Sequence, residues 1–444
     1  MFDILTDINR VLWEILMPLL FGGCAVYFTY KLKFIQLRRF REIFTETIGA
    51  MFKKDEKNDS ANEQSTKKIT PFAAMSAALA ATAGVGNIAG VATAITAGGA
   101  GAIFWMWVSA YFCMAIKYAE VYLAKVYRRK NGEGYIGGPM YYIRDGLGKP
   151  VLAGVFAVMC VLCSFGIGNL VQSNAAGEAL NRAFSIPAGV SGVLLAAVTA
   201  VVIFGGARRI YSFTSRIIPV MSLFYIAFAL IVIIARNNEI LPAFGRIFSE
   251  AWSFQAVGGG AAGYAISRAL RFGLARGIFT NEAGLGSSPI AHAAAEGTTP
   301  ARQGMWGMFE VFADTHILCT LTALVILTAG GTFTGILDGT ALTLASFASV
   351  LGGGAEIFLA AAITLFALAS MVGWAHYGTS CVNYMSGGRG ISGLFYKMVF
   401  VCVIYAGAVS LSGTVWLTSD LLNALMAVPN LIALVMLADR VKGE

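Results

Sequence analysis

The stretch that decides the fold of this chain is AATAGVGN, residues 80–87. It lies inside an apolar segment, residues 71–98, that is long enough to cross a lipid bilayer. Backbone that leaves helical geometry in hydrocarbon persists only where its polar groups line a cavity or meet a ligand. A second such stretch, FTNEAG at 279–284, interrupts the apolar segment 262–296. Paired interrupted helices in the two halves of a membrane protein are typical of the substrate site of a secondary transporter.

Composition independently indicates a membrane protein. Hydrophobic residues make up 57% of the 444 residues, and charged residues make up 13%, against about 25% in soluble domains. The mean hydropathy is +0.71. The seven cysteines lie in or beside apolar segments, so we predict no disulfide bonds, and the acidic N-terminal segment does not resemble a cleavable signal peptide. The expected fold class is therefore an all-α polytopic membrane protein.

Spans of about twenty apolar residues predict about eleven transmembrane helices. They lie near residues 11–32, 71–98, 102–126, 151–182, 187–206, 212–235, 262–296, 302–329, 354–385, 393–412 and 415–438. Two shorter amphipathic pieces, near 36–53 and 341–351, are expected at the membrane interface. Residues 54–68 are charged and free of aromatic residues, which predicts a flexible connector.

The simplest division of these helices is one leading helix followed by two blocks of five. Because five is odd, the second block begins on the opposite side of the membrane, which makes an inverted repeat. The predicted parts are a leading helix (1–33), a cytoplasmic amphipathic segment with a linker (34–70), the first repeat (71–236), an extracellular loop (237–261), the second repeat (262–438) and a cytoplasmic tail (439–444).

Charge distribution predicts the orientation. Most lysines and arginines fall in alternate loops, at 33–70, 125–149, 205–216, 293–303, 386–392 and the C-terminus. The positive-inside rule then places the C-terminus in the cytoplasm and the N-terminus outside, in the cell membrane. Basic loops facing anionic lipid explain the net charge of +8, so we expect the lipid bilayer and not nucleic acid as a partner.

Several motifs, in this order, resemble the alanine or glycine:cation symporters, often called sodium:alanine symporters. They are GNIAGVATAI (86–95), FWMW (104–107), GGPMYYI (137–143), GNLVQ (168–172), ARGIFTNEAGLGSSPIAHAAA (275–295), DTHILCTLTALVIL (314–327), GWAHYG (373–378) and NALMAVPNLIAL (423–434). The resemblance runs from about residue 12 to 437. It implies a LeuT-type fold and uptake of small amino acids, alanine or glycine, driven by a gradient of sodium or, less often, protons. It implies no cofactor and no obligate protein partner.

The chain departs from this family at three positions. Val85 stands where the family usually has threonine, so any ion or substrate contact through that hydroxyl is lost. Ala100 replaces a proline, which removes a rigid turn. Thr280 replaces the commoner serine and keeps a hydroxyl.

The first interrupted helix supplies most of the expected site. Gly84 and Gly86 could simply let two helices pack closely, but glycines two apart do not share a helix face, and the polar Asn87 follows. We therefore expect an unwound segment whose N–H groups take a substrate carboxylate. The candidate ligands here are Gly84 and Gly86 for the substrate, Thr82 and Asn87 for the substrate or a cation, and the carbonyl oxygens of Ala80 and Ala83 for a cation.

Two later helices contribute further candidates. Ser370 and Trp374 lie four residues apart and so share a helix face. If that face meets the first interrupted helix, as the resemblance implies, Ser370 offers its hydroxyl to the cation and Trp374 closes the pocket. The alternative for Trp374 is a residue of the membrane-interface belt. Gln172 and Asn169 lie three apart on one face; the resemblance implies a substrate contact for Gln172, while Asn169 fits either a contact or interhelical packing.

The second interrupted helix offers Phe279, Thr280 and Asn281 as substrate contacts, with Asn281 the closest. Glu282 is an intramembrane carboxylate and is therefore a functional candidate by default. It could meet the substrate ammonium. We favour instead a structural or gating charge pair with a preceding arginine, Arg276 foremost.

Other functions fit less well. Ser287, Ser288 and three histidines do not form a set of nucleophile, base and orienting group, so an intramembrane protease is disfavoured and no enzyme is expected. A channel uses bare carbonyls too, but it usually needs rotational repetition. A sensor would need a signalling domain. Sodium is preferred over protons because we expect no carboxylate in segment 71–98 or close to Ser370; proton coupling would turn attention to Glu282 and the acidic residues of 302–329.

Overall fold

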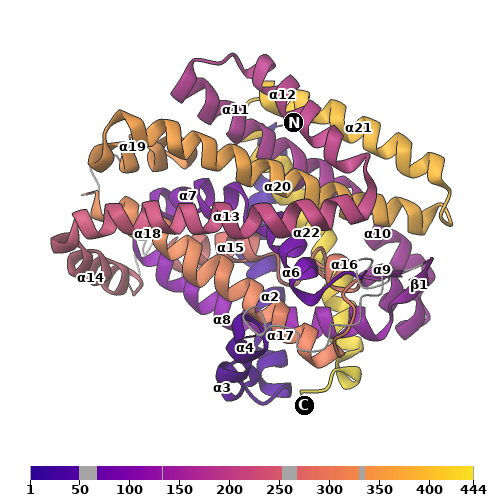
Figure 1. Ribbon diagram of the computed structural model, residues 1–444. Helices are drawn as coiled ribbons and strands as arrows, with labels where there is room; N and C mark the ends of the chain where they lie inside the picture. The colour runs from indigo at the N-terminus through magenta and orange to yellow at the C-terminus, as the bar shows by residue number, and fades with distance from the viewer. Residues whose placement is uncertain (1, 50–67, 133, 253–267, 330–335, 444) are drawn as a thin grey trace, which may run out of the picture.

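The computed structural model describes residues 2–49, 68–132, 134–252, 268–329 and 336–443, and these form a bundle of helices (Figure 1). The described strands are one short hairpin, β1 (Arg129–Asn131) with β2 (Gly134–Ile136). The expected all-helical class is confirmed.

Seven described helical spans are long and apolar enough to cross a membrane. They are α8 (Gly101–Val126), α10 (Pro150–Phe165) with η5 (Gly166–Leu170) and α11 (Val171–Phe184), α13 (Gly206–Ala235), α17 (Pro300–Val311) with η7 (Phe312–Cys319) and α18 (Thr320–Thr328), α20 (Gly353–Met385), α21 (Gly390–Val409), and α22 (Ser412–Met436). An eighth span is a pair of helices, α6 (Pro71–Thr82) and Val85–Gly98, which contains α7 (Ala89–Gly98), bent by 61° at the break between them.

The other three predicted spans are helical too, but among the described residues seven or eight helices, rather than eleven, have the length and composition of a membrane span. Residues 11–32 belong to a helix that begins earlier than predicted: α1 (Phe2–Val11), η1 (Leu12–Leu16) and α2 (Met17–Lys31). Helix α12 (Ala188–Ile203) has 16 residues. The segment 262–296, described from residue 268, contains α15 (Arg268–Asn281) and α16 (Pro289–His292), separated by irregular backbone.

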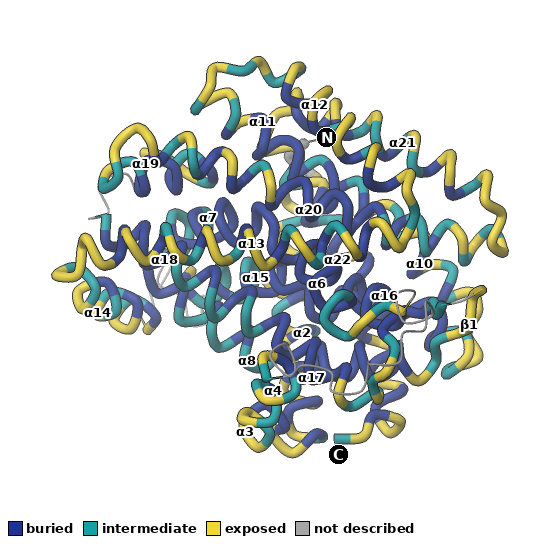
Figure 2. The backbone as a smooth tube through the Cα atoms, in the orientation of Figure 1, coloured by how far each residue is buried: buried dark blue, intermediate teal, exposed yellow. Residues whose placement is uncertain are grey.

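Apolar side chains lie on the outside of the bundle and polar side chains lie within it, which is the pattern of a protein in lipid. Val193 of α12 and Leu223 of α13 are exposed, whereas Asn87 and Lys117 are buried. Figure 2 shows exposed residues along the outer helices and buried residues through the centre, where the broken helices lie. Burying polar groups at the centre requires partners for them, and the site described below supplies many of these partners.

Helices that correspond in the two predicted halves pack against each other in four of the five pairs, among them α7 with α15. Counting the bent pair as helix 1, α8 contacts α17, α10 and α11 contact α20, and α12 contacts α21. Helix α6 of the bent pair also contacts α17. In the same way α15, which corresponds to the bent pair in the second half, contacts α8. Such pairing of helix n with helix n+5 is what a twofold relation between inverted repeats produces.

Several shorter elements complete the structure. They are α3 (Ile35–Arg38), α4 (Phe40–Glu46), α9 (Pro139–Tyr141), η4 (Tyr142–Gly146), η6 (Asn237–Glu239), α14 (Ile240–Glu250), α19 (Gly339–Leu351) and η8 (Ala438–Arg440). The predicted interfacial segment 36–53 thus contains α3 and α4, and the connector 54–68 lies outside the described residues except for Lys68.

Helix α14 was not predicted, because residues 237–261 were expected to form a loop. Ala243 and Ile247 lie four residues apart on one face of α14 and are buried, and α14 packs against α8.

Helix α19 forms close to the predicted place. Its buried face packs against α7 and α20, so protein contacts help to hold it in position.

Candidate functional site

The first broken helix unwinds where the sequence predicts. Helix α6 (Pro71–Thr82) ends at Thr82, and Ala83, with ψ of 76°, and the extended Gly84 leave helical geometry. A single 3₁₀ turn, η3 (Val85–Asn87), precedes α7 (Ala89–Gly98). All residues from Ala83 to Ile88 are buried. The non-helical backbone is therefore enclosed by protein. Inside a membrane such backbone is stable only when protein or a cavity shields its polar groups from hydrocarbon.

Gly84 is the point where three elements meet. A Cβ atom added to Gly84 would lie 2.5 Å from Ser370 Oγ of α20 and 2.9 Å from Gln172 Oε1 of α11. The predicted convergence of Ser370 and Gln172 on the unwound segment is thus present. Only glycine leaves room for both side chains.

Two of the three predicted cation ligands, Ser370 and the carbonyl of Ala80, lie together beside this point. Ser370 Oγ donates a hydrogen bond to the carbonyl of Ala80 at 2.9 Å, and its distance to the carbonyl oxygen of Ala81 is 3.3 Å. Gly373 allows this approach, because a Cβ there would lie 3.0 Å from the Cβ of Ala81. Thr82, a predicted substrate ligand, instead directs its hydroxyl back to carbonyls of its own helix, at Ala78 and Leu79.

Gln172 and Asn169 do not serve the same site. Gln172 Oε1 accepts a hydrogen bond from the backbone N–H of Val85 at 3.2 Å. Asn169 Nδ2 donates to the carbonyl of Phe400 in α21 at 2.7 Å, so Asn169 joins two helices. Of the two readings for Asn169, this bond is the interhelical one, and it joins the π turn η5 to α21.

Asn87 connects the unwound segment to Asp314, a carboxylate that the sequence analysis considered only for proton coupling, among the acidic residues of 302–329. Its Oδ1 accepts from Gly84 N at 3.2 Å, and its Nδ2 donates to Asp314 Oδ1 at 2.8 Å and to the Asp314 carbonyl at 3.0 Å. Thr322 Oγ1 donates to the Asn87 carbonyl at 2.8 Å. The absence of a nearby carboxylate, which supported sodium over protons, is therefore wrong, because Asp314 reaches the segment from η7. An intramembrane aspartate in the motif DTHILCTLT (314–322) was the available signal.

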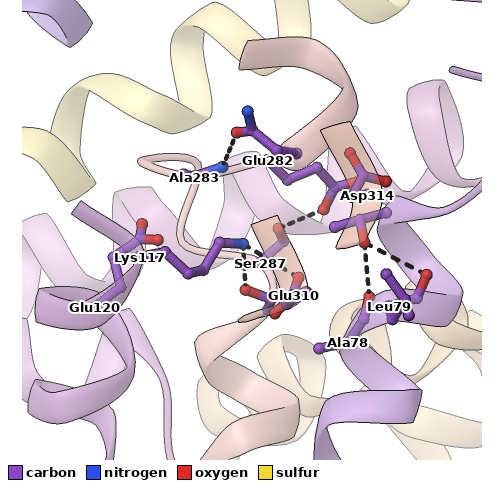
Figure 3. A network of polar contacts seen from close by, with 12 residues as sticks. Ala78, Leu79, Lys117, Glu120, Glu282, Ala283, Ser287, Glu310 and Asp314 are labelled. Atoms are coloured by element: carbon purple, nitrogen blue, oxygen red, sulfur yellow. Dashed lines mark hydrogen bonds and ion pairs between the residues drawn. The ribbon is translucent and has the colours of Figure 1, made fainter. Parts of the chain in front are cut away.

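The second broken helix carries its own irregular segment after Asn281. Glu282, Gly284 and Gly286 have φ of 52°, 90° and 83°, which are left-handed conformations that glycine adopts easily. Glu282 Oε1 accepts from Trp374 Nε1 at 3.2 Å, and its Oε2 accepts from Ser287 Oγ at 2.6 Å (Figure 3 shows the bond to Ser287).

The predicted charge pair between Glu282 and Arg276 is wrong. Arg276 pairs with Asp420 of α22, with 3.5 Å between Nη1 and Oδ1. Arg276 lies within α15, whereas Glu282 follows the end of that helix with φ of 52°, so helical spacing does not bring their side chains together.

Trp374 lies inside the protein and not in an interfacial belt. Its side chain is fully buried, and a Cβ added to Gly168 would lie 2.3 Å from its Cβ. Together with the bond to Glu282, this contact places the indole between η5 and the second broken segment.

The two broken helices face each other. Phe279 Cδ1 and Thr280 Oγ1 each lie 3.7 Å from the position that a Cβ of Gly86 would take. Asn281 Oδ1 accepts from Ala283 N at 3.0 Å, whereas its buried Nδ2 has no hydrogen-bond partner among the described residues. A buried amide donor left unpaired is costly unless a ligand supplies the acceptor.

A cavity of about 420 Å³ lies beside the hairpin and reaches α20 two residues beyond Trp374. Tyr211 and His376 line it, and the Tyr211 hydroxyl lies 3.1 Å from His376 Nε2 and 3.2 Å from the Ala291 carbonyl oxygen. Ile290 and Ala294, which follow the second broken segment, also line this cavity.

These features define a multi-pass membrane transporter and not an enzyme: long apolar helices surround two broken helices that meet at a buried polar site. The chain belongs to the sodium:alanine symporter family, whose model matches residues 1–444.

Individual relatives span nearly the whole chain. A sodium/alanine symporter of Methanococcus maripaludis is 40% identical, with 100% of this chain and 96% of that protein covered. A probable sodium/glutamine symporter of Bacillus subtilis is 37% identical, covering 97% and 87%. Among solved structures, a manganese transporter mutant of Eremococcus coleocola aligns with a TM-score of 0.44 and 14% identity, covering 83% of this chain and 72% of that one.

Proposed function

We propose that this protein imports small neutral amino acids, alanine or glycine, together with sodium by alternating access. The observation that carries the proposal is the unwound segment at Gly84, which Ser370 and Gln172 approach so closely that only glycine fits. Membership of a family of sodium-coupled amino-acid symporters supports the same reading.

The amino-acid substrate binds between the broken helices. Its carboxylate takes N–H groups of the unwound segment near Gly84 and Gly86, at the N-terminal end of α7, where the helix dipole favours negative charge. The unpaired amide of Asn281 offers a further donor. Phe279 and the bulky Trp374 limit the side chain that fits, which favours alanine and glycine over larger substrates.

The sodium ion binds where Ser370 Oγ and the Ala80 carbonyl are 2.9 Å apart, with the Ala83 carbonyl as a further ligand. Hard cations prefer oxygen ligands of this kind. Sodium thereby joins α20 to the first broken helix and orders the substrate segment. The ion gradient is used only if sodium binds the substrate-competent state more tightly than the alternative state. The protein works in the cell membrane with its N-terminus outside and its C-terminus in the cytoplasm.

Proton-coupled symport is the second candidate, because Asp314 is a buried carboxylate in contact with the unwound segment. Uptake of labelled alanine into proteoliposomes tests both. We expect accumulation with an inward sodium gradient and not with an inward proton gradient alone. Competition by unlabelled amino acids, glutamine included, ranks the substrates. No accumulation with either gradient would refute symport.

Gln172→Ala is expected to lower alanine uptake at least about tenfold. The substitution removes the acceptor for the buried Val85 N–H, and an unpaired buried donor costs about 1–3 kcal/mol. Asn87→Ala should likewise abolish accumulation. The matched control is Asn169→Ala, which removes an amide that binds α21 and should keep transport. Normal uptake by both site variants, at equal amounts of folded protein, would remove this site from the mechanism.

Ser370→Ala is expected to raise the sodium concentration for half-maximal uptake by about tenfold, since one oxygen ligand is lost. Ser380→Ala is the control, because Ser380 lies on the same helix and bonds only the carbonyl of His376 within it. Sodium titration of uptake by the two variants distinguishes them, and an unchanged sodium dependence in Ser370→Ala would exclude this ligand.

A further inference from the structure

Another cavity, of about 270 Å³, lies where the leading helix meets the second predicted repeat. Its lining includes Asn9 of α1, Trp13 of η1, Arg276 of α15 and Asp420 of α22. The proposed orientation places this cavity toward the outside of the cell, because the N-terminus of α1 lies on that side. The substrate and sodium sites proposed above use none of these four residues.

Two aromatic rings separate this cavity from the unwound segment of the first broken helix. The Arg276 guanidinium lies 5.5 Å from the ring centroid of Phe279 and 5.2 Å from that of Trp416, within range of a cation–π interaction. The centroids of the two rings are 5.3 Å apart. Phe279 in turn lies 3.7 Å from the position that a Cβ of Gly86 would take. A ligand at Arg276 would therefore lie one layer of rings away from the central site.

Two buried polar atoms of residues that line the cavity have no hydrogen-bond partner among the described residues. Arg276 Nε is a donor, and Asn9 Oδ1 is an acceptor. Leaving a buried donor or acceptor unpaired is costly, so such atoms usually meet water or a ligand. A ligand that satisfies both atoms must carry an acceptor for Arg276 and a donor for Asn9.

The charges at the cavity select the same kind of ligand. Arg276 Nη1 and Asp420 Oδ1 are 3.5 Å apart, and the two side chains are 15% and 13% exposed. Strong pairs of arginine and carboxylate are shorter and often join through two parallel hydrogen bonds, so this contact leaves binding capacity on both partners. Trp13 Nε1 donates to the Asp420 carbonyl at 3.0 Å and helps to hold that residue in place. The cavity thus presents one guanidinium and one carboxylate together.

We propose that this cavity is a second binding site for an amino-acid zwitterion, which occupies it before it enters the central site; this inference rests on the amino-acid transport proposed above. The ligand carboxylate accepts from the Arg276 guanidinium, Nε–H included. The ligand ammonium donates to the Asp420 carboxylate and to Asn9 Oδ1.

Occupation of this site also loosens the contact between α15 and α22. The zwitterion supplies each partner of the Arg276–Asp420 pair with a new opposite charge, so their direct contact is no longer needed. Phe279 lies on α15 and Trp416 lies on α22, so the ring contact above Gly86 opens when these helices separate. The ligand thereby favours the state that is open to the outside, because it binds that state more tightly.

Equilibrium binding of labelled alanine to the purified full-length protein tests this site. We expect the wild type to bind two alanine molecules and Gly84→Ala, which blocks the central site, to bind one. In the Gly84→Ala protein, Arg276→Gln and Asn9→Leu should each weaken the remaining binding at least about tenfold. The matched control is Arg302→Gln, because Arg302 is 61% exposed and pairs with Glu46 away from this cavity. Asn9→Leu changes only the leading helix and keeps the test decisive if Arg276→Gln does not fold.

Competition in the Gly84→Ala protein identifies the ligand chemistry. Unlabelled glycine should displace the bound alanine, whereas propionate and ethylamine, which each carry one of the two charges, should not. Displacement by propionate or chloride would assign the cavity to a simple anion and overturn the inference. Wild-type protein that transports alanine but binds one molecule, with none bound to Gly84→Ala, would overturn this site and leave the transport function intact. Wild-type protein that binds no alanine would refute both.

Discussion

Gly84→Ala is expected to abolish alanine uptake, with a loss of more than about 100-fold, which corresponds to about 3 kcal/mol. The backbone at Gly84, with φ of −121°, is open to alanine, so the effect is steric. The new methyl group would lie 2.5 Å from Ser370 Oγ and 2.9 Å from Gln172 Oε1. Moving either side chain breaks its contact with the first broken helix, at Ala80 or at Val85. One methyl group therefore disturbs the substrate and the cation ligands together.

Gly90→Ala is the matched control, because Gly90 lies in α7 and a Cβ there would have no atom within 4 Å. Uptake in proteoliposomes, normalised to the protein that elutes as a single species in detergent, should be normal for Gly90→Ala. If Gly84→Ala also transports alanine at the wild-type rate, Ser370 and Gln172 do not act at this point of the structure.

Lys117→Met is expected to destabilise the protein by about 3–5 kcal/mol, because removing one partner of a buried ion pair leaves the other charge unpaired. Lys117 and Glu310 have side chains that are 0% and 1% exposed. Lys117 also holds Ser288, so its loss frees one end of the second broken segment. Thermal or denaturant unfolding in detergent, followed by tryptophan fluorescence, measures the change.

The double variant Lys117→Met with Glu310→Gln should recover much of the lost stability, since no unpaired charge then remains on the pair. Lys130→Met is the control, because Lys130 is exposed in β1. Equal stability of Lys117→Met and Lys130→Met would show that the buried pair contributes little, whatever its geometry.

Local patterns in the chain predicted the parts of the site that depend on neighbours in sequence. The glycines and Asn87 in an apolar segment predicted the unwinding between α6 and α7, because non-helical backbone in hydrocarbon needs a ligand-lined enclosure. The spacing of Ser370 and Trp374 predicted a shared inward face, and both residues are fully buried. Helix α14 was missed because its apolar face is short and flanked by polar residues.

The sequence by itself thus determined the membrane class, the helical spans, the two breaks and the family, since each follows from hydrophobic length and local motifs. Only the tertiary structure decided which charges are paired. Arg276 binds Asp420 rather than Glu282, and Asp314 meets Asn87 from a position 227 residues away. The physical reason is that a buried charge takes its partner from whichever helix packs beside it, and helix packing depends on contacts between segments far apart in the chain.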